Sequence, residues 1–263
     1  MLEKQRQQLI LDILAEQNYA SVQTLTEHLN SSEATIRRDI IKLAKENRLR
    51  KIRGGAEKAS EHNIAQKKPP LNSSTFLVDK EKHAATKRLI AEKAVSLCND
   101  GDSIIINGGS STYMMGEFLV DRQLNILTNS FYLAQDLIAN SENQVTLPGG
   151  EIYRRQGIVL SAFENDTIQY YHGSVMFMGT PGICELGVME SDPLLIRAEQ
   201  KLQKQADKLI ILADSSKLGK RSNLIFETLE KVDVLITDDG ATDSMLALFK
   251  ENNVEVILVP KSD

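Results

Sequence analysis

The chain has 263 residues, of which 41% are hydrophobic and 25% charged, with a formal net charge of −5. This composition is typical of a soluble globular protein, and the acidic balance excludes a chain that coats nucleic acid without selectivity. No apolar run approaches the roughly 20 residues that span a bilayer, so we expect no membrane contact. The first ten residues lack the apolar core of a signal peptide, and the two cysteines lie far apart. We therefore expect a cytoplasmic protein with reduced thiols, no metal and no cofactor.

Residues 1–58 differ from the remainder in charge and in pattern. They carry 11 Lys and Arg against 8 Asp and Glu, which leaves a formal charge of −8 on the rest of the chain. Apolar residues at helical spacing predict helices over 4–17, from a Ser21 cap to Leu29, and over 33–46. Three short helices with a tight polar turn before the third are typical of a DNA-binding helix-turn-helix.

The third predicted helix has two faces of opposite character. Ile36, Ile40 and Leu43 fall in one narrow sector, which predicts the buried face. The opposite side carries hydroxyls and cations, which suit the phosphates and base edges of a major groove. Asp39 is interpreted as an intramolecular partner that orients the neighbouring cations, Arg38 among them.

Residues 48–55 follow this helix and alternate between apolar and cationic side chains up to a Gly-Gly pair. This pattern predicts a β-hairpin wing whose cations lie along the DNA backbone or in the minor groove. Helix and wing together predict a set of DNA-contacting residues: Ser32, Thr35, Arg37, Arg38, Lys42, Lys51 and Arg53.

Residues 59–75 are polar, include a Pro-Pro pair and show no sustained period, which predicts a linker to a second domain over 76–263. In that domain apolar strands alternate with helices. Strands are predicted near 103–106, 124–128, 144–147, 175–178, 209–213, 233–236 and 254–258. Helices are predicted near 79–97, 111–119, 130–140, 192–206 and 242–250. This alternation predicts an α/β fold with a largely parallel sheet and helices on both faces.

Glycines and hydroxyl residues collect where these strands end. Ligands of parallel sheets bind at the carboxyl ends of strands, where small residues and unpaired N–H groups suit an anion. Four such loops, two with nearby cations, predict a site for a phosphate-bearing small molecule. The predicted ligand-binding residues are Asn107, Gly108, Gly109, Ser110, Ser111, Thr128, Asn129, Gly149, Gly150, Arg154, Asp214 and Lys217.

Other polar residues of the second domain have less specific interpretations. Lys201 is a further candidate cation, although a surface lysine is equally consistent with its position. His172 is interpreted as structural, and Glu164, Glu185 and Asp192 as solvated surface carboxylates rather than ligands for sugar hydroxyls.

The run SSEATIRRDIIKLAKENRLRKIRGGA resembles the helix-turn-helix of the DeoR family of bacterial regulators. It matches the family pattern at Thr35, Ile36, Arg37, Arg38, Asp39, Ile40, Leu43, Gly54 and Gly55. The second domain resembles the family's sensor, whose fold is similar to ribose-5-phosphate isomerase, in the AEQK and DSSK stretches and in the loops after the first and third strands. The resemblance implies a repressor whose affinity for operator DNA depends on a sugar-phosphate effector. We expect a homo-oligomer, a dimer or tetramer, with heads on repeated half-sites.

Within the family, the spacing of segments 161–179, 185–201 and 213–221 resembles regulators of L-ascorbate utilisation, which implies L-ascorbate 6-phosphate as the effector. The first loop departs from the family, with Gly109-Ser110-Ser111 for its Gly-Thr-Thr and Asn107 for its usual acidic residue. A different sugar phosphate and an activator remain alternatives. An isomerase or deaminase is disfavoured, because Asp214 shows no second carboxylate in its loop and a DNA-binding head does not suit a metabolic enzyme.

Overall fold

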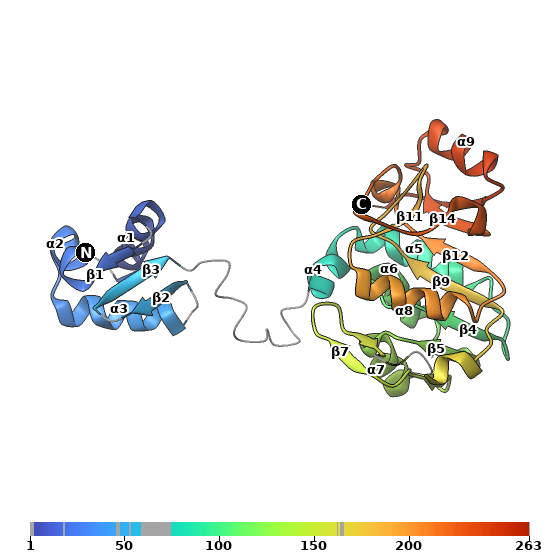
Figure 1. Cartoon of the computed structure of the whole chain (residues 1–263), viewed down its shortest axis with the longest axis horizontal. Coiled ribbons are helices and arrows are strands. Elements are labelled where there is room, and N and C mark those ends of the chain that lie inside the picture. The colour runs from blue at the N-terminus through green and yellow to red at the C-terminus, as the bar shows by residue number, and fades with distance from the viewer. Residues whose placement is uncertain are drawn as a thin grey trace. The chain divides into compact units, whose positions relative to one another are not determined.

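The structure is a computed structural model, and it describes residues 3–17, 19–45, 48–52, 54–58, 75–161, 163 and 166–262 (Figure 1). The chain divides into two compact units, Met1–Lys68 and Pro69–Asp263, which we call the head and the sensor unit. The predicted linker lies outside the described residues as far as residue 74, and Thr75 begins a helix. None of the helices in the described ranges is long and apolar enough to cross a membrane.

The described part of the head contains helices at the three positions that the sequence predicts: α1 (Glu3–Gln17), α2 (Val22–Leu29) and α3 (Glu33–Lys45). Ser21 caps α2 as expected, because its hydroxyl oxygen accepts a 3.0 Å hydrogen bond from the Thr24 amide. Asn30, with φ 43°, ends α2 in the left-handed conformation and turns the chain towards α3. The three helices share one apolar core, which includes Ile10, Leu25, Ile36 and Leu43.

A small antiparallel sheet in the order β1-β3-β2 completes the head: β1 (Tyr19–Ser21), β2 (Leu49–Ile52) and β3 (Gly55–Lys58). β2 and β3 form the predicted wing, in which Gly54 turns the chain with φ 84°. A Cβ at Gly55 would lie 2.3 Å from the carbonyl oxygen of Ala20, so glycine is needed where β3 pairs with β1. The sequence does not predict β1, because three residues between two helices are too few to show alternation.

The sensor unit is built on a seven-stranded sheet in the order β15-β14-β12-β9-β4-β5-β6. Its strands match the seven predicted positions: β4 (Ser103–Ile106), β5 (Asn125–Thr128), β6 (Gln144–Thr146), β9 (Val175–Gly179), β12 (Leu209–Leu212), β14 (Val234–Asp238) and β15 (Glu255–Val259). Every neighbouring pair is parallel, which confirms the predicted fold class. The strand order reverses between β4 and β9, and ligands of open α/β sheets bind in the crevice at such a switch point.

Helices cover both faces of this sheet (Figure 1). They are α4 (Thr75–Glu81), α5 (Ala84–Val95), α6 (Ser110–Tyr113), the 3₁₀ helix η3 (Met114–Phe118), α7 (Phe131–Asn140), α8 (Pro193–Gln203) and α9 (Asp243–Glu251). Successive side chains of β4 enter different cores, as strand geometry requires. Ile104 and Ile106 pack in the core that contains α5 and α7, whereas Ile105 packs in the core that contains α8 and α9.

The predicted single helix over 79–97 is wrong, because the chain forms α4 and α5 with a break between them. His83 adopts the left-handed conformation, with φ 54°, at the start of α5. The Lys87 ammonium donates a hydrogen bond to the backbone carbonyl of Asp79 and so ties α4 to α5 across the break. Apolar spacing does not reveal this break, since the spacing is helical on both sides of it.

Short strands outside the parallel sheet are also absent from the sequence-based prediction. They are the hairpin β7 (Glu151–Tyr153) with β8 (Ile158–Leu160), and the antiparallel sheet of β10 (Gly182–Cys184), β11 (Gly187–Glu190) and β13 (Leu224–Glu227). Each has only three or four residues, which is too short for a period of two to be recognised.

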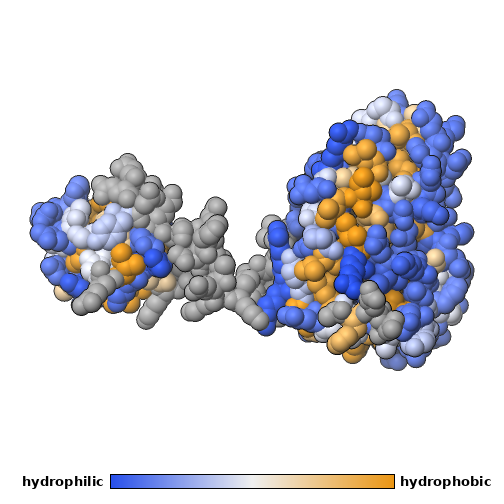
Figure 2. All heavy atoms as spheres, in the orientation of Figure 1, coloured by the Kyte–Doolittle hydropathy of each residue, from blue (hydrophilic) through white to orange (hydrophobic). Residues whose placement is uncertain are grey.

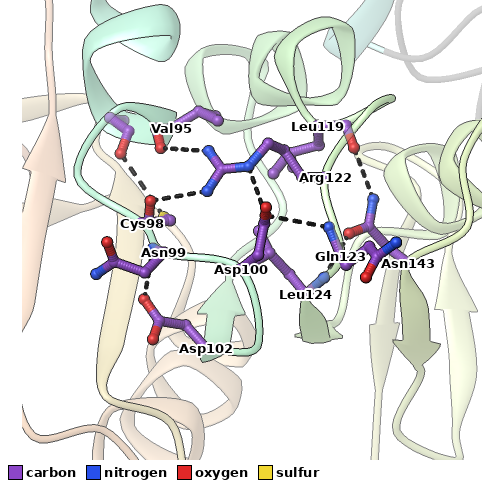
Figure 3. A network of polar contacts seen from close by, with 11 residues as sticks. Val95, Cys98, Asn99, Asp100, Asp102, Leu119, Arg122, Gln123, Leu124 and Asn143 are labelled. Atoms are coloured by element: carbon purple, nitrogen blue, oxygen red, sulfur yellow. Dashed lines mark hydrogen bonds and ion pairs between the residues drawn. The ribbon is translucent and has the colours of Figure 1, made fainter.

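A polar network holds the amino-terminal edge of the sheet, before β4 and β5 (Figure 3). The Arg122 guanidinium donates to the carbonyl oxygens of Val95 and Cys98, at 3.3 and 2.8 Å, and to the Asp100 carboxylate at 2.7 Å. The Arg122 hydrogen bond holds the pKa of Asp100 below its usual range. Burial raises the pKa of Cys98 to about 11, so this cysteine stays an unreactive thiol. These contacts fix the edge of the sheet opposite to the strand ends that could bind a ligand.

Candidate nucleic-acid interface and ligand pocket

Helix α3 has the two faces that its sequence predicts. Ile36, Ile40 and Leu43 are buried in the head core. Arg37, Arg38 and Lys42 are exposed, and Thr35 is half-buried. The exposed side therefore presents cations and a hydroxyl, the side-chain types that contact DNA.

The exposed residues of α3 differ in how they are held. Ser32 caps the helix, because its hydroxyl oxygen accepts a 3.3 Å hydrogen bond from the Thr35 amide. Arg37 forms an ion pair with Glu33, one helical turn earlier, at 3.1 Å. The Arg38 side chain makes no hydrogen bond or ion pair with any residue that the structure describes. Arg38 thus keeps its donors available for an external partner.

Asp39 does not hold the cations of α3 as the sequence suggests. It is buried, and its carboxylate accepts a 2.6 Å hydrogen bond from Arg6 and a 3.0 Å hydrogen bond from Gln7, both on α1. Asp39 therefore joins α3 to α1 inside the head. Asp39 is thus an intramolecular partner as predicted, but it pairs with residues of α1 and not with the cations of α3.

The wing has one paired cation and one that faces solvent. Arg50 on β2 forms an ion pair with Glu57 directly opposite on β3, which raises the pKa of Arg50 and lowers that of Glu57. Lys51 is exposed on the same strand. Arg53, also predicted to contact DNA, lies outside the described residues.

A pocket of about 260 Å³ lies at the carboxyl ends of β4, β9 and β12 in the sensor unit, where the strand order reverses. Six of the predicted ligand-binding residues line it: Gly108, Gly109, Ser110, Ser111, Asp214 and Lys217. The loops after β4 and β12 meet there because both strands neighbour β9.

The other six predicted residues do not line this pocket. Asn107, Thr128 and Asn129 are buried behind it, and the Asn129 side-chain oxygen accepts a 2.7 Å hydrogen bond from the Gly108 amide. Asn129 therefore holds the glycine loop in position. Gly149, Gly150 and Arg154 also lie outside the lining, whereas Arg155, the next residue in the chain, is part of it.

Helix α4 and the start of α5 form a wall of the pocket that the sequence does not predict. Phe76, Asp79, Lys82, His83 and Lys87 line it. The buried Lys87 ammonium donates a 3.1 Å hydrogen bond to the Ser110 hydroxyl. Burial lowers the pKa of Lys87, the nearby Asp214 raises it, and Lys217 lowers it further. The sequence does not predict that Lys87 lines the pocket, because the surrounding segment has the pattern of an ordinary helix.

An aromatic cluster fastens α4 to the rest of the sensor unit. The Phe76 ring stacks on Tyr132, with centroids 4.8 Å apart, and meets the edge of Tyr113 at 5.3 Å. The Lys80 ammonium lies 4.5 Å from the centre of the Tyr113 ring. The first helix of the sensor unit is therefore bound directly beside the ligand pocket.

Carboxylates from other segments also line the pocket, although the loop of Asp214 contains no second one, as the sequence shows. Asp79, Glu190 and Glu199 line the same cavity. Glu199 and Asp214 are buried, and each has one side-chain oxygen without a hydrogen-bond partner among the described residues. The pocket thus offers both cations and acids to a ligand.

The remaining candidates from the sequence lie elsewhere. Lys201 forms a 2.9 Å ion pair with Asp166, away from the pocket. His172 and Glu185 are paired at the surface with Asp207 and Arg221, respectively.

Asp192 and Glu164 are the other two carboxylates considered from the sequence. Asp192 caps α8 and accepts a 2.8 Å hydrogen bond from the Tyr153 hydroxyl, whereas Glu164 lies outside the described residues. Over the described ranges, no group of three His, Cys, Asp or Glu side chains could hold a metal ion.

Family models match both units of the chain. The DeoR-like helix-turn-helix domain matches residues 6–62, and the DeoR C terminal sensor domain matches residues 82–239. The chain belongs to the DeoR family. The HTH-type transcriptional regulators UlaR of Shigella dysenteriae serotype 1 (strain Sd197) and of Escherichia coli O1:K1 / APEC are each 34% identical to it over 262 residues, which cover 98% of this chain and 100% of the relative. This DeoR-family chain is therefore a helix-turn-helix transcriptional regulator with a sensor domain.

Solved structures resemble the sensor unit more distantly. The ribose 5-phosphate isomerase A of Methanocaldococcus jannaschii is 17% identical, with a TM-score of 0.39, over 52% of this chain and 55% of that chain. The ribose 5 phosphate isomerase A of Neisseria gonorrhoeae is 20% identical, with a TM-score of 0.36, over 53% and 54%.

Proposed function

We propose that this chain is a sequence-specific repressor of transcription whose affinity for operator DNA is controlled by a phosphorylated sugar. One observation carries the proposal: the chain combines a helix-turn-helix with an exposed cationic face and, in a separate unit, a pocket lined by lysines and hydroxyls. Membership of a family of transcriptional regulators supports the role of the head.

In this proposal α3 enters the major groove. Arg38 reads a base edge, since its guanidinium can bind guanine through two N–H groups, and Thr35 and Arg37 contact the adjoining bases or phosphates. The remaining contacts, to phosphates, come from Ser32, Lys42, Lys51 and Arg53. The cations add affinity that falls with salt, and Arg38 adds specificity.

We expect Arg38→Ala to weaken binding to the chain's own operator by about 1–3 kcal/mol while leaving the fold intact, because it removes a base contact from an exposed position. A gel-shift titration against operator and scrambled DNA at one salt concentration measures this. The matched control is Arg88→Ala, an exposed arginine of the sensor unit that pairs with Glu117 and should leave DNA binding unchanged. Equal losses on operator and scrambled DNA would mean that Arg38 contacts phosphate instead.

We further propose that the chain acts as a homo-oligomer, a dimer or tetramer, which places heads on repeated half-sites. Figure 2 shows hydrophobic residues gathered in bands on one face of the sensor unit. Across the sensor unit as a whole, the exposed large apolar side chains include Ile138, Leu186, Leu194, Ile225 and Leu258. Apolar surface of this kind supports association between copies.

The effector of the proposed repressor is a sugar phosphate. Lys217, Lys87 and the Ser110 hydroxyl supply donors for a phosphate, and the acids of the pocket suit the sugar. The segments 161–179, 185–201 and 213–221 resemble those of regulators of L-ascorbate utilisation. We therefore propose L-ascorbate 6-phosphate as the first ligand to test. Because α4 follows the linker and also forms a pocket wall, a ligand that moves α4 changes how the head is tethered.

We propose that the sensor unit acts without turnover, in the cytoplasm, and requires no cofactor. The pocket contains acids that an isomerase could use, so this part of the proposal depends on the fused helix-turn-helix and on relatives that are regulators. Incubation with each sugar phosphate should return it unchanged.

The decisive experiment is a gel shift on DNA upstream of the chain's own gene in the presence of a panel of phosphorylated sugars, L-ascorbate 6-phosphate included. We expect a specific shift that one panel member reverses, with a coupling of about 1–3 kcal/mol, or about 5–150-fold in affinity. The same compound should raise the unfolding temperature of the full chain. A shift that no sugar phosphate changes would contradict the proposed control.

A further inference from the structure

The pocket has two ends with different electrostatic surroundings. The charged groups near the buried Lys87 ammonium are Asp214, Lys217, Asp79 and Lys82. Lysines and aspartates therefore lie together on this side of the pocket, with the Ser110 hydroxyl bonded to Lys87. The charge that acts on Glu199 is Glu190, a second buried carboxyl. One end of the pocket therefore holds three lysines together with two aspartates, and we call it the lysine end; the other holds a pair of glutamates.

Glu199 is held in a fixed orientation at the glutamate end. It lies on α8 with 3% of its surface exposed, and its Oε1 accepts a 3.0 Å hydrogen bond from the Asn107 side-chain amide. Its Oε2 has no hydrogen-bond partner among the residues that the structure describes. Asn107 is itself fixed, because its side-chain oxygen accepts a 3.1 Å hydrogen bond from the Gly179 amide. Glu199 lines the pocket, and one buried oxygen of this fixed carboxyl is without a partner among the described residues.

The two glutamates are not equivalent. Glu190 Oε1 accepts hydrogen bonds from the Ser191 amide at 2.5 Å, the Ser191 hydroxyl at 3.1 Å and the Asp192 amide at 3.2 Å, whereas Glu199 Oε2 accepts none from the described residues. Burial raises the pKa of Glu199 well above its usual range, and the nearby Glu190 raises it further. When two carboxyls share a site, the less solvated one keeps a proton.

We propose that Glu199 is a specificity-determining residue that carries a proton and donates it in a hydrogen bond from Oε2 to an uncharged oxygen of the sugar. The phosphate of the same ligand then binds at the lysine end. This inference rests on the proposed function, since it assigns a part of the proposed effector to each end of that pocket. It explains how the pocket separates a sugar phosphate from inorganic phosphate, which reaches the lysines but leaves Glu199 without a partner.

Two substitutions separate this role from a structural one. Glu199→Gln is the neutral mimic of a protonated glutamate, because its amide oxygen still accepts from Asn107 and its NH₂ group donates into the pocket. Glu199→Met has a similar volume and no donor. Because it leaves the buried Asn107 amide without its acceptor, the variant should unfold at a lower temperature than the wild type, and binding is measured where both are folded.

Titration calorimetry on the full chain measures the affinity for inorganic phosphate and for the sugar phosphate that reverses the gel shift. We expect Glu199→Met to weaken sugar-phosphate binding about tenfold or more and to leave inorganic phosphate unchanged. Glu199→Gln should keep both affinities within about threefold of the wild type.

Four outcomes would overturn the inference. Equal losses for both ligands in Glu199→Met would show a structural role, and no loss would show that Oε2 contacts no ligand. A loss in Glu199→Gln as large as in Glu199→Met would mean that Glu199 acts as a charged acceptor. If the wild type binds inorganic phosphate and no sugar phosphate, the proposed function itself fails, and this inference fails with it.

Discussion

Asp39→Ala is expected to lower the free energy of unfolding of the head by about 3 kcal/mol, because it breaks a buried ion pair and leaves Arg6 without its carboxylate. The Asp39 and Arg6 side chains are only 5% and 13% exposed, so water replaces the lost contact poorly. In a unit of this size such a loss lowers the unfolding temperature by on the order of 10–20 °C. Calorimetry of the full chain should show one transition moved and the sensor transition unchanged. DNA binding should fall with the folded fraction of the head.

The matched control is Asp12→Ala on α1, an exposed carboxylate whose hydrogen-bond partner among the described residues is Gln8, one turn earlier on the same helix. A surface change of this kind should alter stability by less than about 0.5 kcal/mol. If Asp39→Ala instead weakened DNA binding at full stability, Asp39 would be orienting the α3 cations as its sequence position suggests. The structure favours a role in stability, since Asp39 accepts hydrogen bonds from Arg6 and Gln7, both on α1.

Lys217→Glu is expected to weaken binding of the sugar-phosphate effector by about 3 kcal/mol, or more than about a hundredfold, because it replaces a cation of the pocket by an anion facing a phosphate. Lys217 is half-buried on the loop after β12, so solvent screens this interaction less than at an open surface. Operator binding without effector should be unchanged. In the gel shift, the variant should stay on DNA at effector concentrations that release the wild type.

Lys220→Glu provides the control, because Lys220 is exposed on the same loop and is not part of the pocket lining. It changes the net charge by the same amount, so a general electrostatic effect on an anionic ligand would appear in both variants. Similar losses in the two would show that Lys217 does not bind the phosphate. Calorimetry with inorganic phosphate tests the same end of the pocket independently of the sugar.

The parallel strands could be predicted because buried strands are continuous apolar runs, as in Ile104, Ile105 and Ile106 of β4. The α3 faces could be predicted for a similar reason, since helical geometry alone assigns Ile36 and Ile40 to the core. The three-residue strands, such as β7, could not, because pairing rather than pattern defines them.

The pocket was only partly predictable, and the strand order explains why. Gly149 and Gly150 follow a strand, as Gly108 does, but that strand is β6, at the far edge of the sheet from β9. The segment after it contributes Arg155 and Gln156, in the β7–β8 turn, to the pocket lining. Lys87 was missed because it comes from a helix far earlier in the chain, and only folding brings it beside Ser110.

The sequence by itself determined the two units, the helix-turn-helix with its wing, the parallel α/β sheet and the exposed cations of α3, because these follow from local periodicity, caps and turns. The tertiary structure decided which loops share a pocket and which charges are paired. It pairs Asp39 with α1, places α4 against the ligand site and leaves one buried oxygen of Glu199 without a partner among the described residues. These are contacts between segments distant in sequence, and no local pattern specifies them.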